Sequence, residues 1–414
     1  MKISINLLLI FTLSIAAYSN PNALQMSPKH LGSFPRGEFT QAESGDYLLR
    51  NDKIMAVIAS PSNHPAMAGT ILDLAFLNEE DRLAGFLPFQ PDLNHPNLAI
   101  QQNGENGHAS ITAEWDAGKN HGLAAKTTYI IQKNWEGVWL VTSINNTSSH
   151  PKRITAAGRV KGNPQPRQKA GDIYFYGPKK LSQRGGFAWA YLARDGMDIP
   201  SQKITLQPGQ SLKYGQFIAV GSSPAQAWGK VATLLHPLIG YISGRIFDSN
   251  FNPAPTAYIE VEIEDKIVMA YPDRDGIFNF MLPHRSYHLN IHDLGRKSMD
   301  EIAHVKAGAT YGFDCIMNPP SKIDFLVKNQ DGKPLPCTIE FQGMHETPNP
   351  NLSWYYEKGE GNRYHTKKGI FTLRMNPGTY KLIFTSKNYQ STEKIIQLNN
   401  RETRKVSVTL LPQK

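Results

Sequence analysis

A short phrase occurs twice in the C-terminal half of this 414-residue chain. Asp-Gly-Ile-Phe-Asn-Phe-Met-Leu-Pro, from Asp275, has its counterpart in Lys-Gly-Ile-Phe-Thr-Leu-Arg-Met-Asn-Pro, from Lys368. Gly369 and Phe371 follow Gly276 and Phe278 by the same 93 positions. Each copy has a glycine turn followed by alternating apolar residues, a pattern that is typical of a β-hairpin. The spacing is too long for a solenoid repeat, so it predicts two copies of one small β-module.

The N-terminal half also has the pattern of a β-rich domain. Short alternating segments, among them 108–115, 124–132 and 154–160, are separated by Gly, Pro and Asn. Such period-2 segments indicate strands with one buried face. A helix is expected only at 223–235, where Ser223 is a suitable N-cap and the following proline suits the first helical position. The sequence therefore predicts an all-β protein.

The predicted domains follow from these patterns. A large two-sheet β-sandwich, of the supersandwich kind, is expected at 27–236. Two small β-sandwich modules are expected at 238–318 and 320–414, and the second carries an insertion at 344–366. The chain length is ample for three domains of this size.

The first residues have the pattern of a secretory signal peptide. Lys2 precedes an apolar run that ends near Ala17, and Ala17 and Ser19 are small residues at the −3 and −1 positions of a cleavage site. We predict a signal peptide at 1–19. No cysteine lies nearby to anchor a lipid, and no later run approaches the ~20 apolar residues of a membrane span. The mature protein is expected to be secreted or periplasmic.

The formal net charge is +9, and it falls to +8 once Lys2 leaves with the signal peptide. In an exported protein this charge favours anionic surfaces, acidic glycans or lipopolysaccharide over nucleic acid as partners. The basic residues are scattered along the chain, so a well-solvated surface is the simpler interpretation. We predict a glycan or another envelope protein or domain as partner.

The chain has two cysteines, Cys315 and Cys337. Export to an oxidising compartment would allow a disulfide between them. The alternative is a pair of buried free thiols, which we favour because the contact depends on how the two modules pack. Two cysteines alone offer too few ligands for a metal site.

The insertion at 344–366 is the most distinctive polar and aromatic stretch of the chain. Aromatic faces beside polar groups are what sugar stacking or peptide recognition requires. The competing interpretation, which we favour, is that the rings cover a junction with a neighbouring domain. The candidate contact residues are Trp354, Tyr355, Tyr356, Arg363, Tyr364 and His365.

Other clusters have weaker patterns. His288, His292 and Asp293 could share a strand face, but they fall short of a convincing metal set. His345-Glu346 lies in a proline-rich context that forbids a zinc-binding helix. Asp273 and Asp275 fit turn chemistry better than a calcium loop. No catalytic residue, metal or cofactor is predicted, and we expect no enzymatic activity from this set of residues.

The two modules resemble carboxypeptidase regulatory-like domains, which are transthyretin-like or immunoglobulin-like β-sandwiches with a carbohydrate-binding-like fold. The first copy departs from the usual pattern at His284, where the family has glycine after the proline of the bend. The resemblance implies tandem packing or sugar-binding modules. The matching residues are Gly244, Asp248, Pro253, Asp273, Gly276, Phe278, Phe280, Leu282, Pro283 and Tyr287 in the first copy, and Asp331, Gly332, Pro334, Gly369, Phe371, Leu373, Pro377, Gly378 and Tyr380 in the second.

The wider arrangement resembles the non-catalytic front half of exported PHP-type metallohydrolases of the CehA/McbA kind. The similar parts are 32–37, 45–52 and 69–73, followed by the two modules and the insertion. In that family a metal-binding domain with a His-x-His-x-His motif follows the last sandwich, and no His-x-His occurs in this sequence.

Two functions follow from these patterns. The leading hypothesis is an exported, non-enzymatic binding or scaffold protein, with carbohydrate as the expected ligand. The alternative is the front portion of a PHP-type metal-dependent hydrolase whose catalytic domain is missing or separately encoded, with the insertion docking that domain.

Overall fold

The computed structural model describes residues 20–413 except 33, 35–36, 38–39, 78–82, 84, 91–92, 157, 161–166, 178–180, 182–183, 193–196 and 198–202. The predicted signal peptide at 1–19 lies outside these residues. The chain divides into two compact units. The first comprises the chain up to Tyr176 together with Gly185–Pro237, and the second comprises Gly177–Arg184 together with Leu238–Lys414.

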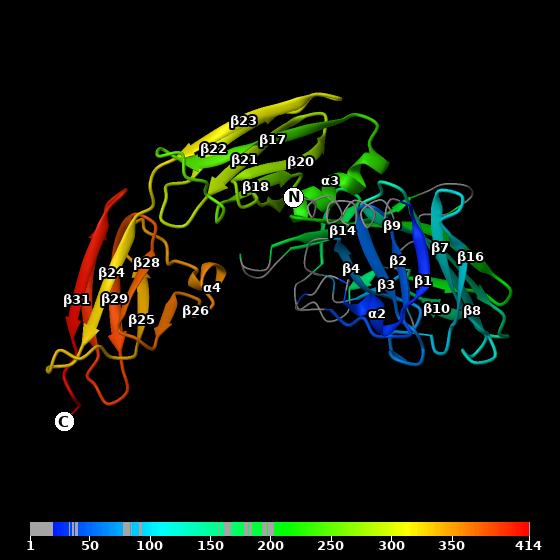
Figure 1. The fold of residues 1–414 in the computed structure, drawn as a ribbon, viewed down its shortest axis with the longest axis horizontal. Coiled ribbons are helices and arrows are strands. Elements are labelled where there is room, and N and C mark those ends of the chain that lie inside the picture. The colour runs from blue at the N-terminus through cyan, green and yellow to red at the C-terminus, as the bar shows by residue number, and fades with distance from the viewer. Residues whose placement is uncertain are drawn as a thin grey trace, which may run out of the picture. The chain divides into compact units, whose positions relative to one another are not determined.

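The first unit is built from two large sheets and a short strand pair (Figure 1). The six-stranded sheet has the order β1 (Asn22–Gln25), β2 (Tyr47–Arg50), β3 (Ile54–Ile58), β4 (Ile71–Phe76), β5 (Phe86–Leu87) and β11 (Arg159–Val160). The eight-stranded sheet has the order β12 (Gln168–Ala170), β13 (Ile173–Tyr176), β14 (Gly186–Leu192), β16 (Ser211–Gly221), β9 (Gly137–Asn146), β8 (Leu123–Gln132), β7 (His108–Trp115) and β6 (Asn97–Asn103). The pair is β10 (Lys152–Ile154) with β15 (Ile204–Leu206).

The main core of this unit includes side chains from both large sheets. Strand β3 is buried throughout. Ile54, Ala56 and Ile58 belong to this core, whereas Met55 and Val57, on the opposite face, belong to a second cluster. Two buried tyrosines of the eight-stranded sheet donate hydrogen bonds to the backbone beside the six-stranded one: Tyr129 to the Gly69 oxygen (2.5 Å) and Tyr214 to the Pro88 oxygen (2.9 Å).

Two helices of the first unit are described. The short α2 (Pro28–Leu31) follows Ser27, and α3 (Pro224–Leu235) packs on β13, β14 and β16. As expected from the sequence, the Ser223 hydroxyl accepts a hydrogen bond from the Gln226 N–H and proline opens α3.

The prediction of a continuous strand at 154–160 is wrong. Strand β10 ends at Ile154 and pairs with β15, whereas β11 begins at Arg159 and pairs with β5. Between them, Gly158 lies so close to Phe86 and Trp189 that a Cβ atom would come within 2.7 Å of both rings. The chain passes from one sheet to another near Gly158, so the two ends of the segment 154–160 pair with different strands.

The second unit has two pairs of sheets. The first pair comprises a three-stranded sheet and a four-stranded sheet within residues 239–317. The three-stranded sheet has the order β20 (Ile277–Pro283), β17 (Ile239–Asp248) and β23 (Thr310–Met317). The four-stranded sheet has the order β19 (Lys266–Ala270), β18 (Tyr258–Ile263), β21 (Ser286–His292) and β22 (Met299–His304).

The second pair repeats this arrangement within residues 322–409. Its three-stranded sheet has the order β28 (Ile370–Arg374), β24 (Lys322–Lys328) and β31 (Thr403–Thr409). Its other sheet has the order β26 (Gly359–Glu360), β27 (Arg363–Thr366), β25 (Cys337–Gly343), β29 (Gly378–Thr385) and β30 (Thr392–Leu398). In both copies the central strand of the three-stranded sheet has one antiparallel and one parallel neighbour.

The two copies differ most at one hairpin. Strands β18 and β19 are joined by the turn at Glu264 and Asp265, whereas residues 344–362 separate β25 from β27. This longer segment carries the short helix α4 (Leu352–Tyr355) and the small strand β26. The insertion predicted from the sequence therefore replaces a hairpin turn.

The all-β fold class is confirmed, with multiple β-sandwich modules built from mainly antiparallel sheets. The predicted domain limits of 27–236, 238–318 and 320–414 stay a prediction. Within the described part of the chain, no helix has the length and apolar character needed to cross a membrane.

Candidate functional site

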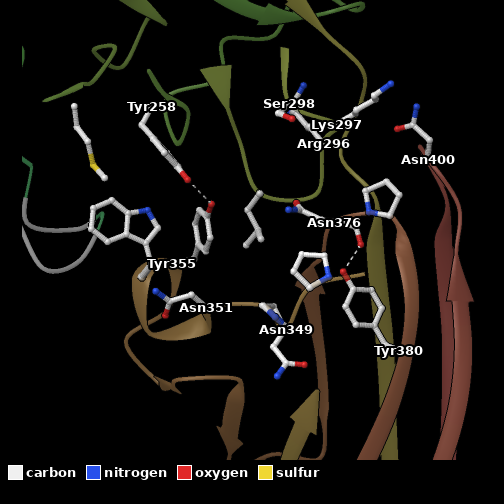
Figure 2. Close-up of a pocket in the computed structure, with 16 residues that line it drawn as sticks. Tyr258, Arg296, Lys297, Ser298, Asn349, Asn351, Tyr355, Asn376, Tyr380 and Asn400 are labelled. Atoms are coloured by element: carbon white, nitrogen blue, oxygen red, sulfur yellow. Dashed lines mark hydrogen bonds between the residues drawn. The ribbon is translucent and has the colours of Figure 1, made fainter. Parts of the chain in front are cut away.

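Described residues of the second unit line a pocket of about 660 Å³ (Figure 2). They come from β18, β19, the loop that follows β21, the insertion, β29 with the turn before it, and the turn after β30. Both copies of the repeated module thus contribute. The volume lies in the range of ~300–1,000 Å³ that is usual for small-molecule sites.

Aromatic side chains line part of this pocket. Trp354 of α4 meets the ring of Tyr258 edge-on, with 5.9 Å between ring centroids and an interplanar angle of 72°. The hydroxyl of Tyr355 donates to that of Tyr258 over 3.4 Å, a contact drawn as a dashed line in Figure 2. Burial raises the pKa of both tyrosines, so both hydroxyls stay protonated at neutral pH.

Asparagine amides form a second group in the lining. The Oδ1 atom of Asn349 accepts a hydrogen bond from the Gly343 N–H (2.7 Å), and that of Asn351 accepts one from the Ser353 hydroxyl (2.6 Å). The Oδ1 atom of Asn376 accepts one from the Gly295 N–H (2.8 Å). These contacts hold the amides in place on two different loops, the insertion and the turn before β29.

A buried charge network supports the pocket from behind. Arg296 is 4% exposed, and its Nε lies 2.8 Å from Asp293 Oδ2. Its Nη1 donates to the Asn318 oxygen over 2.6 Å, and its Nη2 lies 3.8 Å from Asp248 Oδ2. The charge of Arg296 is therefore compensated, as a buried cation requires.

The same network joins the two copies of the module. Arg374 of β28 donates to the Thr256 hydroxyl (3.1 Å) and lies 3.9 Å from Asp293 Oδ2. Thr256 in turn donates to Asp293 Oδ1 over 2.7 Å. Desolvation raises the pKa of Asp293, against the Thr256 hydrogen bond and the charges of Arg296 and Arg374. Removing one partner would leave a buried charge uncompensated.

The structure divides the six candidate residues of the insertion. Trp354 and Tyr355 line the pocket. Tyr356 and Tyr364 instead pack against the core of the second module, and the Tyr356 hydroxyl accepts from the Arg374 N–H over 2.8 Å. Burial raises the pKa of Tyr356 to about 12.

Arg363 and His365 lie on β27, away from the described pocket lining. Arg363 Nη2 is 3.0 Å from Glu340 Oε2, and His365 Nε2 is 3.3 Å from Glu360 Oε2. Both pairs lie on the exposed face of the sheet, where ion pairs contribute little stability.

The other sequence candidates lie in ordinary structural surroundings. His292 stacks on Tyr258 with 5.1 Å between centroids, and its neighbour Asp293 belongs to the charge network. Asp273 Oδ1 accepts from the N–H groups of Asp275 and Ile277, both at 2.9 Å, which is turn chemistry. Among the described residues, no group of three or more His, Cys, Asp or Glu side chains is placed to hold a metal ion.

Cys315 and Cys337 are both buried and free in the structure, so no bridge joins them. Cys315 lies on β23 in the first copy, and Cys337 begins β25 in the core of the second. Each thiol is packed within its own module.

Sequence reasoning missed the part of the pocket that lies outside the insertion. It did not single out Tyr258, the loop residues Arg296, Lys297 and Ser298, or the turn residue Asn376. The sequence shows both the loop at 296–298 and the turn at Asn376 as polar turns that follow a strand. Most loops of a β protein have this pattern, so it does not indicate which loops lie together in the fold.

No protein-family model matches the chain, and no curated protein matches it. Among solved structures, the Bacillus anthracis TIE protein aligns at 12% identity over 88% of this chain and 55% of that one, with a TM-score of 0.21. The streptococcal ancillary pilin aligns at 10% identity over 55% and 76%, with a TM-score of 0.25. An α-mannosidase from Enterococcus faecalis aligns at 9% identity over 63% and 39%, with a TM-score of 0.31.

These are distant likenesses among β-rich proteins, and no family is identified. The chain spans about half of the length of the TIE protein. The resemblances to carboxypeptidase regulatory-like domains and to the front half of PHP-type metallohydrolases stay predictions.

Proposed function

We propose that this chain is an exported, non-enzymatic binding protein that holds a carbohydrate in the pocket of its second unit. The observation that carries the proposal is the lining itself, in which aromatic rings and asparagine amides surround a space of about 660 Å³. The proposed export rests on the signal-peptide pattern of residues 1–19.

These groups suit sugars for a physical reason. A sugar ring has apolar C–H faces that pack on aromatic rings, and its hydroxyls donate and accept hydrogen bonds. Trp354 supplies the largest ring, and Tyr258 and Tyr355 supply further ring surface. The amides of Asn349 and Asn376 supply polar contacts that fix orientation.

The chemistry of the lining is that of recognition. None of the sixteen described lining residues is Asp, Glu, His or Cys. Paired carboxylates, which most glycosidases use as acid and base or nucleophile, do not occur among them. This composition supports binding as the proposed activity.

The proposal predicts that Trp354→Ala weakens saccharide binding by about fivefold to tenfold, because a stacking surface is lost. Trp354→Phe is the matched control, since it keeps a ring. It also removes an indole N–H that is buried and has no hydrogen-bond partner within the described part of the chain. The measurement is a glycan screen with the full chain, followed by titration calorimetry of each variant with the best oligosaccharide.

Thermal unfolding would verify that both variants fold. Unchanged affinity in folded Trp354→Ala would remove the pocket as the binding site. It would favour the alternative in which the insertion docks another domain. Tyr356 is unsuitable for this test, because its hydroxyl is bound to the Arg374 backbone and its substitution would disturb the core.

A further inference from the structure

Three of the four asparagines that line the pocket use their amide oxygen within the protein, and no partner of the fourth, Asn400, is found in the described residues. The Oδ1 atoms of Asn349, Asn351 and Asn376 each accept one hydrogen bond from a protein donor. Their Nδ2 groups have no hydrogen-bond partner among the described residues. Each of these three side chains therefore keeps both of its amide donors for a molecule in the pocket, whereas one of the two acceptor sites of its oxygen is used by the protein.

The charged side chains at the pocket also favour an anionic ligand. Arg296 is neutralised by Asp293 and Asp248 behind the lining. Lys297, the next residue, is exposed, and no ion pair with it is found in the described residues. No carboxylate occurs among the described lining residues, so the ammonium group of Lys297 leaves a net positive charge at the pocket.

Figure 2 shows how these groups are distributed. Tyr258 and Tyr355 lie on one side of the view, and Lys297 and Asn400 lie on the other, with Asn376 between them. A ligand that filled the pocket would thus meet ring surface beside Tyr258 and Tyr355 and a cation beside Lys297, with asparagine amides on both sides. A sugar ring that carries an anionic substituent has both matching properties.

We propose that the pocket selects acidic saccharides, specifically sugars with a carboxylate such as uronic acids. The inference rests on the proposed function and adds its ligand class. The carboxylate is an acceptor-only group when ionised, so it fits a donor-rich site that lacks competing carboxylates. Lys297 is a specificity-determining residue in this assignment, and the aromatic rings hold the sugar ring irrespective of its charge.

The test compares two ligands that share their rings and linkages and differ only at their carboxyl groups. Titration calorimetry with the full chain uses trigalacturonate and its fully methyl-esterified form, which keeps the same rings and linkages. We expect trigalacturonate to bind more tightly by at least about tenfold, as a charge-assisted hydrogen bond would give.

Two variants locate the effect. Lys297→Gln should weaken trigalacturonate binding by about fivefold, a value reduced for the exposure of this side chain. It should leave binding of the ester unchanged. Lys333→Gln is the matched control, because Lys333 is exposed in a turn of the same unit, does not line the pocket and carries the same charge.

The outcomes separate the two proposals. Equal affinity for the acid and its ester would overturn the acidic selectivity and leave saccharide binding standing. Equal weakening by Lys297→Gln and Lys333→Gln would also overturn the assignment, because the attraction would then come from the general charge of the chain. Absence of saccharide binding by the wild-type chain, in this test and in the glycan screen, would overturn the proposed function itself.

Discussion

The two cysteine thiols show how burial sets chemistry at the scale of one residue. Cys315 Sγ lies 3.4 Å from Met299 Sδ, and burial together with the charge of Glu301 raises its pKa to about 11. Burial alone raises the pKa of the Cys337 thiol to about 12. The thiolate is the reactive form of cysteine, so neither side chain is poised for chemistry at neutral pH.

We predict that a thiol reagent at pH 8 leaves both cysteines of the folded protein unmodified. In guanidinium chloride, without reductant, two thiols per chain should react, because unfolding exposes both and no bridge joins them. A thiol count on native and denatured protein measures this directly. Finding no thiols in the denatured chain would contradict the free state.

The same shifts have a consequence for the pH dependence of stability. The fold favours the neutral thiols, so above the ordinary pKa of 9.0 the unfolded chain releases protons that the folded chain retains. Their contribution to the free energy of unfolding is therefore constant below about pH 8. It decreases as the pH rises toward the folded values of about 11 and 12.

At the scale of elements, the two copies of the module share their turns as well as their strands. The oxygen of Gly276 accepts from the Ile246 N–H, and the oxygen of Gly369 accepts from the Val327 N–H, both at 2.8 Å. The hydroxyls of Tyr287 and Tyr380 each donate to the backbone oxygen four residues earlier, at 3.0 and 2.9 Å. These contacts fix the same hairpins in both copies.

Gly369 is expected to tolerate no side chain. Its φ is +66°, and a Cβ would lie 2.6 Å from backbone atoms of Leu335 and Val327. We predict that Gly369→Ala lowers the free energy of unfolding by more than about 2 kcal/mol, because backbone overlap adds to left-handed strain. Urea unfolding of the full chain measures the loss.

Gly332→Ala separates these two contributions. Gly332 has φ +77°, yet nothing lies within 4 Å of where its Cβ would be. It should therefore lose only about 1 kcal/mol from the left-handed conformation. An equal loss in both variants would show that backbone overlap plays no part at Gly369.

At the scale of the whole molecule, the predicted export can be tested on the purified product, because export by a signal peptide removes residues 1–19. If residues 1–19 are a signal peptide, the exported protein begins at Asn20. We predict that N-terminal sequencing of the exported product starts at Asn20. A product that retains Met1 would contradict cleavage, and an intact mass above that of residues 20–414 would favour the alternative of a hydrolase with a further domain.

Much of the fold was predictable because it depends on local chemistry. Apolar residues alternate around Phe278 and Phe280, and a glycine lies at each turn. This local pattern predicts a hairpin irrespective of the contacts with the rest of the chain. The repeat of this pattern at 93 positions required a second copy of the module. The helix at 224–235 followed from its serine cap and first-turn proline in the same way. These features are specified within a few residues of each other, so the sequence by itself determined them.

The candidate site depends on contacts that no local pattern encodes. Trp354 and Tyr356 are two positions apart and looked equivalent, yet one lines the pocket and the other is bound into the core. Which ring lies where depends on the contacts of Trp354 and Tyr355 with Tyr258, which is far away in the sequence, and on the hydrogen bond between Tyr356 and the Arg374 backbone. The same holds for Asn376 and Lys297, which belong to different copies of the module. Only the tertiary structure decided that these two residues line one pocket. The physical reason is that the buried ion pair of Arg296 and Asp293 and the hydrogen bond from the Gly295 N–H to Asn376 form where the two copies pack together.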